Sequence, residues 1–101
     1  MKVVLCNCSP GEARGLARKL VEEGVAACVN ILPGVTSTYT WEGVLTEDAE
    51  TTLLIKVAAE RVPALRERIR ALHSYDLPEF VVLDVDVDAS DPDYVRWVRG
   101  A

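Results

Sequence analysis

The chain has 101 residues, with 16 acidic and 11 basic side chains and a formal net charge of −5. A chain of this length buries roughly two-thirds of its unfolded surface, which predicts a single domain over residues 1–101 whose core needs no disulfide or metal. The acidic balance repels phosphate groups and anionic lipid, which argues against nucleic acid and membrane surfaces as partners.

The first predicted elements are a strand and a helix. Residues 2–8 are apolar and β-prone, which is typical of a strand. The segment Ser9-Pro10-Gly11-Glu12 then has the form of a capping box, with proline at the first helical position. The helix should end at Gly24, since glycine tolerates the left-handed conformation that closes many helices. Its predicted apolar stripe consists of Ala13, Leu16, Ala17, Leu20 and Val21.

A long β-hairpin is predicted next. Residues 26–31 indicate a short buried strand, which Pro33-Gly34 should interrupt before the chain resumes an extended course over 35–41 with period two. Glu42-Gly43 predicts a hairpin turn, and a return strand leads from Val44 to Val57. Both arms are long beside the usual strand of about five or six residues.

The second half predicts a helix, a loop, a strand and a last helix. Pro63 opens the helix, whose inner stripe is Val62, Leu65, Ile69 and Leu72. After a loop over 73–78, residues 79–87 predict a fourth strand with Val81, Leu83, Val85 and Val87 on one face. Asp91-Pro92 then opens a short helix with Tyr94, Val95 and Val98.

The resulting order, β-α-β-β-α-β with a short C-terminal helix, predicts an α+β ferredoxin-like sandwich. In that arrangement both main helices cover one face of an antiparallel sheet. The long hairpin leaves backbone edges that invite pairing with another subunit, and three copies closing cyclically would satisfy them. We therefore expect a homotrimer.

Cys6-Asn7-Cys8 suggests a soft-metal site, because a thiolate pair suits Cu(I). Residues two apart on a strand lie about 6.6 Å apart, which is awkward for one metal ion and for a disulfide. We therefore interpret Cys8 as an ordinary strand residue, and Cys28 as buried packing. Three cysteines without a secretion signal favour free thiols and a cytoplasmic location.

Other residues suggest chemistry without specifying it. Asp84-Val85-Asp86-Val87-Asp88 resembles the start of a calcium-binding EF-hand loop, but Ala89 stands where that loop needs glycine, so a solvated strand face is the better interpretation. His73, the only histidine, is in isolation more typical of a helix cap than of a ligand. No catalytic triad and no phosphate-binding glycine loop can be assembled, so we expect no enzyme.

Several short motifs keep their order over nearly the whole chain. They are Leu20-Val21-Glu22-Glu23, Ala26-Ala27-Cys28-Val29-Asn30-Ile31, Pro33-Gly34, Ser37-Thr38-Tyr39, Trp41-Glu42-Gly43, Leu54-Ile55-Lys56, Leu72-His73 with Tyr75, Pro78-Glu79, and Tyr94 with Trp97. Together they resemble the CutA family of divalent-cation tolerance proteins. The resemblance implies a ferredoxin-like fold, a PII-like homotrimer built by pairing the hairpin arms, a cytoplasmic location, and a link to copper and other divalent cations.

The same resemblance implies site residues. Cys6, His73 and Glu79 match positions of metal ligands, although Leu72 stands where some members have a first histidine and Ser74 where the family has proline. Trp41, Lys56 and Tyr75 match residues expected to line a cleft between subunits. No cofactor is implied as a requirement, and copper or another divalent cation is the implied ligand.

Three functions remain open from the sequence. The first is a trimeric, non-enzymatic copper and divalent-cation tolerance protein that binds metal weakly. The second is a PII-like trimer that senses a small molecule in clefts between subunits, an analogy from fold alone. The third is a small-molecule enzyme that uses Lys56, His73 and Glu79.

Overall fold

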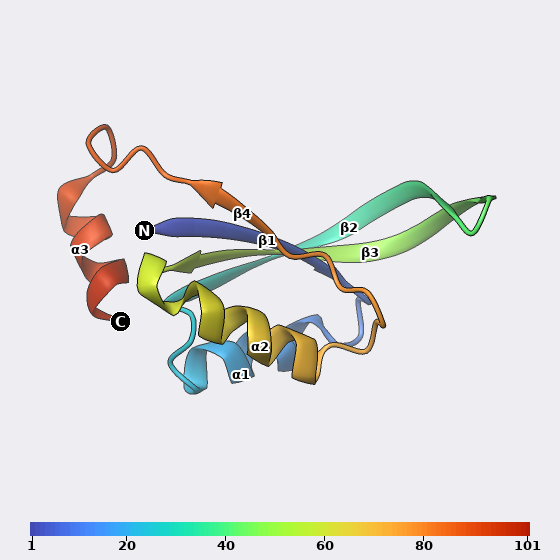
Figure 1. Cartoon of the computed structure of the whole chain (residues 1–101), viewed down its shortest axis with the longest axis horizontal. Coiled ribbons are helices and arrows are strands. Elements are labelled where there is room, and N and C mark those ends of the chain that lie inside the picture. Colours follow the sequence, from blue (N-terminus) through green and yellow to red (C-terminus); the bar gives the residue numbers. More distant parts are fainter.

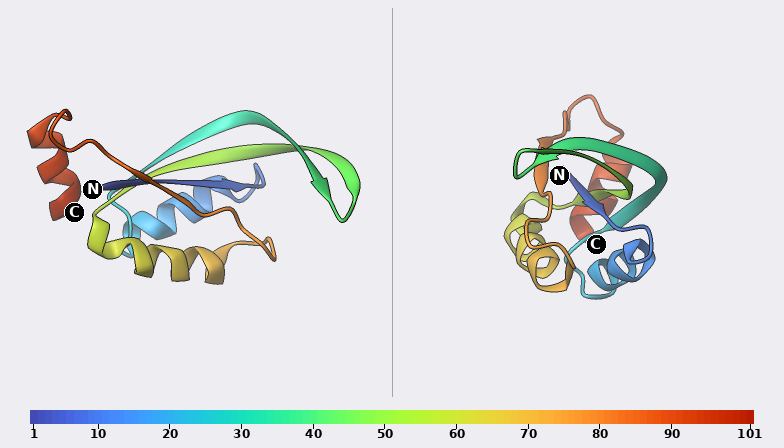
Figure 2. Two further views of the ribbon diagram at one scale, coloured as in Figure 1. Left: turned by 45° about the horizontal axis from the view of Figure 1, so that its top comes forward. Right: turned by 90° about the vertical axis from the view of Figure 1, so that its right-hand side faces the viewer.

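The computed structural model describes all 101 residues and confirms the ferredoxin-like arrangement (Figure 1). The four strands form one antiparallel sheet in the order β2-β3-β1-β4, and α1 and α2 cover one of its faces (Figures 1 and 2). The elements are β1 (Lys2–Cys8), α1 (Ala13–Glu22), β2 (Cys28–Trp41), β3 (Val44–Val57), the 3-10 turn η1 (Ala59–Arg61), α2 (Val62–Leu72), β4 (Val81–Asp84) and α3 (Pro92–Gly100).

The hydrophobic core lies between the sheet and these two helices. Alternate residues of β1 and β3 point towards the helices, as expected from the period of a strand, and the helices bury their own apolar stripes against them. Among the core residues are Val4, Cys6, Cys8, Leu16, Leu20, Leu53, Ile55, Val57, Leu65 and Ile69. The predicted inner stripe of α2 is confirmed, with Val62 and Leu72 partly buried at its ends.

The opposite face of the sheet, here called the open face, is apolar and has neither α1 nor α2 over it (Figure 2). Strand register places Leu5 between Leu54 and Val81, and Val3 beside Leu83. Val81 and Leu83 are each 44% exposed. The open face is therefore a continuous apolar row across three strands, defined by Val3, Leu5, Leu54, Val81 and Leu83.

The far parts of β2 and β3 form a hairpin that extends beyond the helices, here called the arm (residues 35–50; Figure 1). As predicted, Glu42 and Gly43 make its turn, and both have positive φ angles, 50° and 81°. Pro33-Gly34 does not divide the strand as predicted. β2 is one continuous strand with only a bulge between Leu32 and Val35. Gly34 makes the bulge possible by adopting a φ of 76°.

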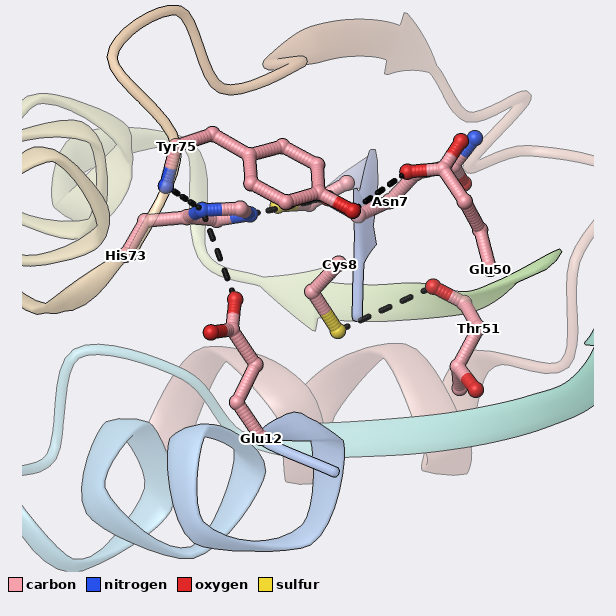
Figure 3. Close-up of polar contacts among 8 residues, drawn as sticks. Asn7, Cys8, Glu12, Glu50, Thr51, His73 and Tyr75 are labelled. Atoms are coloured by element: carbon pink, nitrogen blue, oxygen red, sulfur yellow. Dashed lines mark hydrogen bonds and ion pairs between the residues drawn. The ribbon is translucent and has the colours of Figure 1, made fainter. Parts of the chain in front are cut away.

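The predicted capping box does not form. Helix α1 begins only at Ala13, and its N-cap Glu12 makes no side-chain cap hydrogen bond. The Glu12 amide instead donates to the Ser9 carbonyl at 3.2 Å, closing a turn over the proline. The carboxylate of Glu12 points away from the helix towards His73 (Figure 3). Val21, expected on the buried stripe, is 43% exposed, whereas Gly24 ends the helix region as predicted with a φ of 74°.

The fourth strand is shorter than predicted, because β4 covers only Val81–Asp84 instead of residues 79–87. Its register explains where it stops: Asp84 pairs with Lys2, the first residue of β1, so no neighbouring strand remains beyond it. Asp86 then forms a local turn, accepting from the Ala89 amide at 3.1 Å through its side chain.

At the end of the chain, the predicted last helix is confirmed. The Asp91 carboxylate caps α3 by accepting from the amides of Asp93 and Tyr94 at 2.9 and 3.1 Å. Val95 and Val98 are the buried residues of α3. None of the helices has the length and apolar character needed to cross a membrane.

Candidate functional site

A polar network surrounds His73 where the end of β1 meets the loop after α2 (Figure 3). The imidazole is completely buried. Its Nε2 lies 2.8 Å from the Asn7 carbonyl, which can only accept, so Nε2 carries the hydrogen. Its Nδ1 accepts from the Tyr75 amide at 3.0 Å. Both ring nitrogens are therefore in use, and the Nδ1 lone pair is not free for a metal.

Glu12 approaches the same ring without gaining a hydrogen bond. Its Oε1 lies 3.4 Å from Nδ1 of His73. In the tautomer fixed by Asn7 and Tyr75, Nδ1 has no hydrogen to donate, and Glu12 Oε1 is a buried oxygen without a partner. The Glu12 carboxylate therefore adds negative charge beside His73 but no hydrogen bond to the network.

Tyr75 connects the network to the arm (Figure 3). Its hydroxyl donates to Glu50 Oε2 at 2.9 Å, and its ring packs on His73 with centroids 4.6 Å apart. Burial and the hydrogen bond to Glu50 raise the pKa of Tyr75 far above its ordinary value. Tyr75 is therefore a neutral donor. Glu50 is only 8% exposed, so its carboxylate needs the hydrogen bond from Tyr75 in place of water.

Cys6 and Cys8 face the core and are fully buried, and all three cysteines are free. Burial, with a smaller contribution from neighbouring acidic groups, raises the pKa of Cys6 to about 12 and that of Cys8 to about 11. Cys8 Sγ contacts the Thr51 carbonyl at 3.7 Å (Figure 3). Both thiols are therefore protonated at neutral pH, whereas a metal ligand or nucleophile must be a thiolate.

A cavity of about 820 Å³, here called the arm cavity, lies between the arm and the loop over 74–79. Its walls hold three aromatic rings and four carboxylates, and no lysine, arginine or histidine is among its lining residues. The aromatic residues are Tyr39, Trp41 and Tyr75, and the acidic ones are Asp48, Glu50, Asp76 and Glu79. Glu79 Oε2 is buried and has no hydrogen-bond partner.

The structure brings together only part of the predicted site. Trp41, Tyr75 and Glu79 line the arm cavity, whereas His73 is buried behind it. Lys56 lies near the opposite end of β3, where its ammonium donates to Asn30 and sits 5.8 Å from the ring centroid of Tyr94.

The predicted metal ligands are not arranged as a preformed site. Nowhere does the chain gather three or more histidine, cysteine, aspartate or glutamate side chains in a group that could hold a metal ion. Within one chain, Cys6, His73 and Glu79 therefore lack the convergent geometry of a strong site.

The sequence interpretation missed several residues of the arm cavity. Tyr39, Asp48 and Glu50 reach it because the turn at residues 42 and 43 sets the register of the arm, pairing Ser37 with Asp48 and Val35 with Glu50. That register could have been predicted from the turn alone, since a two-residue turn fixes which residues face each other. The role of Asp76 could not, because loop 73–78 has no such periodic signal.

Comparison with known proteins gives a consistent result. The family model described as CutA1 divalent ion tolerance protein matches residues 2–101. The "Divalent-cation tolerance protein CutA" of Thermus thermophilus is 45% identical, covering 98% of this chain and 96% of that protein. The "Protein CutA homolog" of Xenopus laevis is 43% identical over 85% of this chain, which spans only 56% of the frog protein.

Solved structures agree with the fold. The "PII-like protein CutA" of Nostoc sp. PCC 7120, solved in its apo form, matches with a TM-score of 0.95 and 46% identity, covering 99% of this chain and 95% of that one. The sheet, the arm and the helices described above therefore recur in a protein of nearly the same length.

Proposed function

The chain belongs to the CutA1 divalent ion tolerance family, and from that membership we propose that it is a homotrimeric, non-enzymatic divalent-cation tolerance protein that binds metal ions, copper included, weakly and reversibly. The observation in this chain that best supports an assembled protein is its open apolar face. Three free cysteines also suit a reducing compartment such as the cytoplasm.

The open face and the arm both lack cover within one chain. Val81 and Leu83 of the open face and Trp41 and Val44 of the arm are all 44% exposed or more. Burial of such apolar surface drives association, and closed cyclic symmetry gives every copy the same neighbours. In a trimer, arms laid against neighbouring chains would bring Trp41 and Tyr75 of one chain towards Lys56 of another, as the proposed inter-subunit cleft requires.

The assembly is tested by sedimentation at micromolar concentration. Wild-type protein should sediment as a trimer, and Leu83→Lys should shift it to smaller species because it puts a charge on the open face. Val82→Lys is the matched control, since Val82 is on the same strand, is 41% exposed, and pairs with Val4 on the other face. A monomeric wild type, or equal effects of the two variants, would contradict the proposal.

Weak metal binding follows from the state of the proposed donors, Cys6, His73 and Glu79. Glu79 offers a buried oxygen without a partner. His73 must give up the hydrogen bond from the Tyr75 amide before Nδ1 can coordinate. Cys6 must lose a proton from a thiol whose pKa is about 12. Each cost is subtracted from the affinity, so binding should be reversible and well short of a structural zinc site.

Calorimetric titration with Cu(II) and Zn(II), and with Cu(I) under anaerobic conditions, tests this assignment. Affinity should fall in His73→Gln and Glu79→Gln, while Cys6→Ser should matter chiefly for Cu(I), which prefers soft ligands. Asp86→Asn, which removes an exposed acidic group outside the arm cavity, is the control. Equal affinity of the wild type and all of these variants would place the ions on the general acidic surface and contradict the assignment.

The same chemistry supports a binding protein over an enzyme. A nucleophilic cysteine has a lowered pKa, whereas the pKa values of Cys6 and Cys8 are raised. The only imidazole has both nitrogens engaged by the backbone. Lys56 does not line the cavity that Glu79 lines, and its ammonium lies beside Asn30 and Tyr94, so the two do not act together in one chain.

A second candidate function is small-molecule sensing, and the arm cavity is the observation that favours it. Its volume of about 820 Å³ falls in the range of small-molecule sites, roughly 300–1,000 Å³. Native mass spectrometry of protein purified without added metal separates the two candidates, because it reports subunit number and any retained metal or metabolite together.

A further inference from the structure

We propose that the arm cavity binds a small organic cation that carries N–H donors, an alkylguanidinium or primary alkylammonium group. This deepens the small-molecule candidate by naming a ligand class for its cavity. The proposal does not depend on metal binding, because the cavity would recognise the organic cation through aromatic rings and hydrogen bonds as well as through charge.

Within one chain the charge of the cavity is uncompensated, and in the proposed trimer one Lys56 from a neighbouring chain would offset at most one of its four carboxylates. Four of its lining residues are carboxylic acids and none is basic. Two of these acids already accept a hydrogen bond from a phenol, Asp48 from Tyr39 and Glu50 from Tyr75. Because a phenol is neutral, these bonds orient the carboxylates without cancelling their charge. A concave surface with one sign of charge concentrates ligands of the opposite sign.

The aromatic rings favour an organic cation. Tyr39, Trp41 and Tyr75 are 39%, 51% and 37% exposed, so their rings are available at the cavity wall. Guanidinium and ammonium groups bind over such rings by cation–π attraction, with tryptophan the strongest partner. A cavity walled by rings and carboxylates therefore offers both contacts at once.

A buried acceptor decides the kind of cation. Glu79 lines the cavity, and its Oε2 receives no hydrogen bond within the chain. This oxygen is shielded from solvent in the free protein, so the side chain must turn into the cavity to bind, and a ligand N–H would then supply the missing donor. A quaternary ammonium has no N–H to offer, which leaves guanidinium and primary amine groups.

A bare metal ion fits this cavity less well. Metal ions need several donor atoms converging within about 2.0–2.6 Å, whereas no three acidic, histidine or cysteine side chains of the chain form such a group. The cavity is also far larger than an ion. An organic cation can span the distances that a metal ion cannot.

The test uses n-butylguanidinium and its neutral isostere n-butylurea as probes, titrated by calorimetry into the assembled wild-type protein with EDTA present. n-Butylguanidinium should bind saturably, and n-butylurea should bind at least about tenfold more weakly, the expected loss for a charge-assisted hydrogen bond. Absence of saturable binding, including the case in which a neighbouring chain fills the cavity, would overturn the proposal.

Two matched pairs of variants locate the site. Glu79→Gln should weaken n-butylguanidinium binding about tenfold, while Asp86→Asn, which removes one acid elsewhere, should not. Trp41→Leu should weaken it severalfold, while Trp97→Leu should not, although the two tryptophans are similarly exposed at 51% and 54%. Equal losses within either pair would place the probe on the general acidic surface and overturn the proposal.

The EDTA condition keeps this outcome separate from that of the metal proposal. Binding of n-butylguanidinium without any metal affinity supports the cavity and rejects metal binding by this chain. Metal binding without n-butylguanidinium binding rejects the cavity and leaves the metal proposal standing.

Discussion

The body of the molecule and its arm share the same two strands but bury their side chains very differently. Along β3, every second residue from Leu53 to Val57 is completely buried, whereas none from Val44 to Ala49 is buried. The backbone pairing is equally regular in both parts. The difference lies in what covers the strands, since α1 and α2 end where the arm leaves the body (Figure 1).

This contrast shows that the arm is not stabilised by the core of its own chain. An isolated two-stranded hairpin is marginal in water, and it usually needs a third strand or a helix to persist. The arm here has neither, yet its turn and register are fully formed. We therefore interpret the arm as an assembly and ligand-binding element, and the body as the unit that provides the free energy of folding.

The largest expected difference is between two leucines on the same face of β3. Leu53→Ala should lower the free energy of unfolding by about 2–5 kcal/mol, because Leu53 is fully buried in the core. Leu45→Ala should cost no more than about 0.5 kcal/mol, because Leu45 is 76% exposed. Urea unfolding monitored by circular dichroism measures both. Similar losses would mean that the arm tip is buried in solution as deeply as the core.

The two tyrosine–carboxylate hydrogen bonds provide a second test. Tyr75→Phe should lower the free energy of unfolding by about 1–3 kcal/mol, because it leaves the buried Glu50 carboxylate without its donor. The loss should lie towards the lower end of this range, because Tyr75 is itself 37% exposed. Tyr39→Phe in the arm should leave unfolding unchanged within error, because its partner Asp48 is exposed to water. If Tyr39→Phe were the more damaging variant, the arm would contain the more deeply buried network.

Replacing one glycine in the arm and one in the body by alanine should change the stability in opposite directions. Gly43→Ala should destabilise the arm by about 1–2 kcal/mol, because Gly43 has a φ of 81° that an L side chain adopts only with strain. Gly15→Ala in α1 should stabilise by about 0.5–1 kcal/mol, since its position is helical and a methyl group there meets nothing within 4 Å. Thermal melts of the two variants against wild type measure both shifts. Stabilisation by Gly43→Ala would contradict the observed turn.

The body was predictable from the sequence because its signals are periodic. The alternation in residues 2–8 and the helical spacing of Leu65 and Ile69 follow directly from burial on one face. The errors arose where a local signal competed with a tertiary one. Glu12 fits a capping pattern but lies against His73, and residues 85–87 alternate like a strand although β1 has no residue left to pair with them.

The candidate site was less predictable because it depends on parts that meet only in three dimensions. Trp41, Lys56 and Tyr75 were expected in a cleft between subunits; within one chain Trp41 and Tyr75 line one cavity and Lys56 lies elsewhere, so the cleft itself stays a prediction. The state of His73 depends on the Asn7 carbonyl and the Tyr75 amide, and no side-chain pattern indicates where backbone groups will be. Residue identity could therefore indicate candidate ligands but not whether their donor atoms are free.

The smallest expected effect concerns alkaline pH and belongs to the body alone, since residues 35–50 contain no cysteine. Burial raises the pKa of Cys6 to about 12 and that of Cys8 to about 11, from the ordinary value of 9.0. As pH rises through 9, unfolded thiols lose protons while the buried ones keep theirs, so the folded state binds more protons. The free energy of unfolding must therefore fall with rising pH, from about 9 until the folded thiols ionise near 11–12.

Urea unfolding of wild type and Cys8→Ala at pH 8 and 9.5 measures this dependence before most phenols ionise. Cys8→Ala should be less stable than wild type at both values, because it leaves a small cavity, but it should lose less on going from pH 8 to pH 9.5. The difference between the two slopes reports the Cys8 thiol together with its coupling to Cys6, whose pKa the neighbouring Cys8 helps to raise. An identical slope would mean that Cys8 is as accessible to hydroxide when folded as when unfolded, and that the core beneath the sheet is open where the structure has it closed.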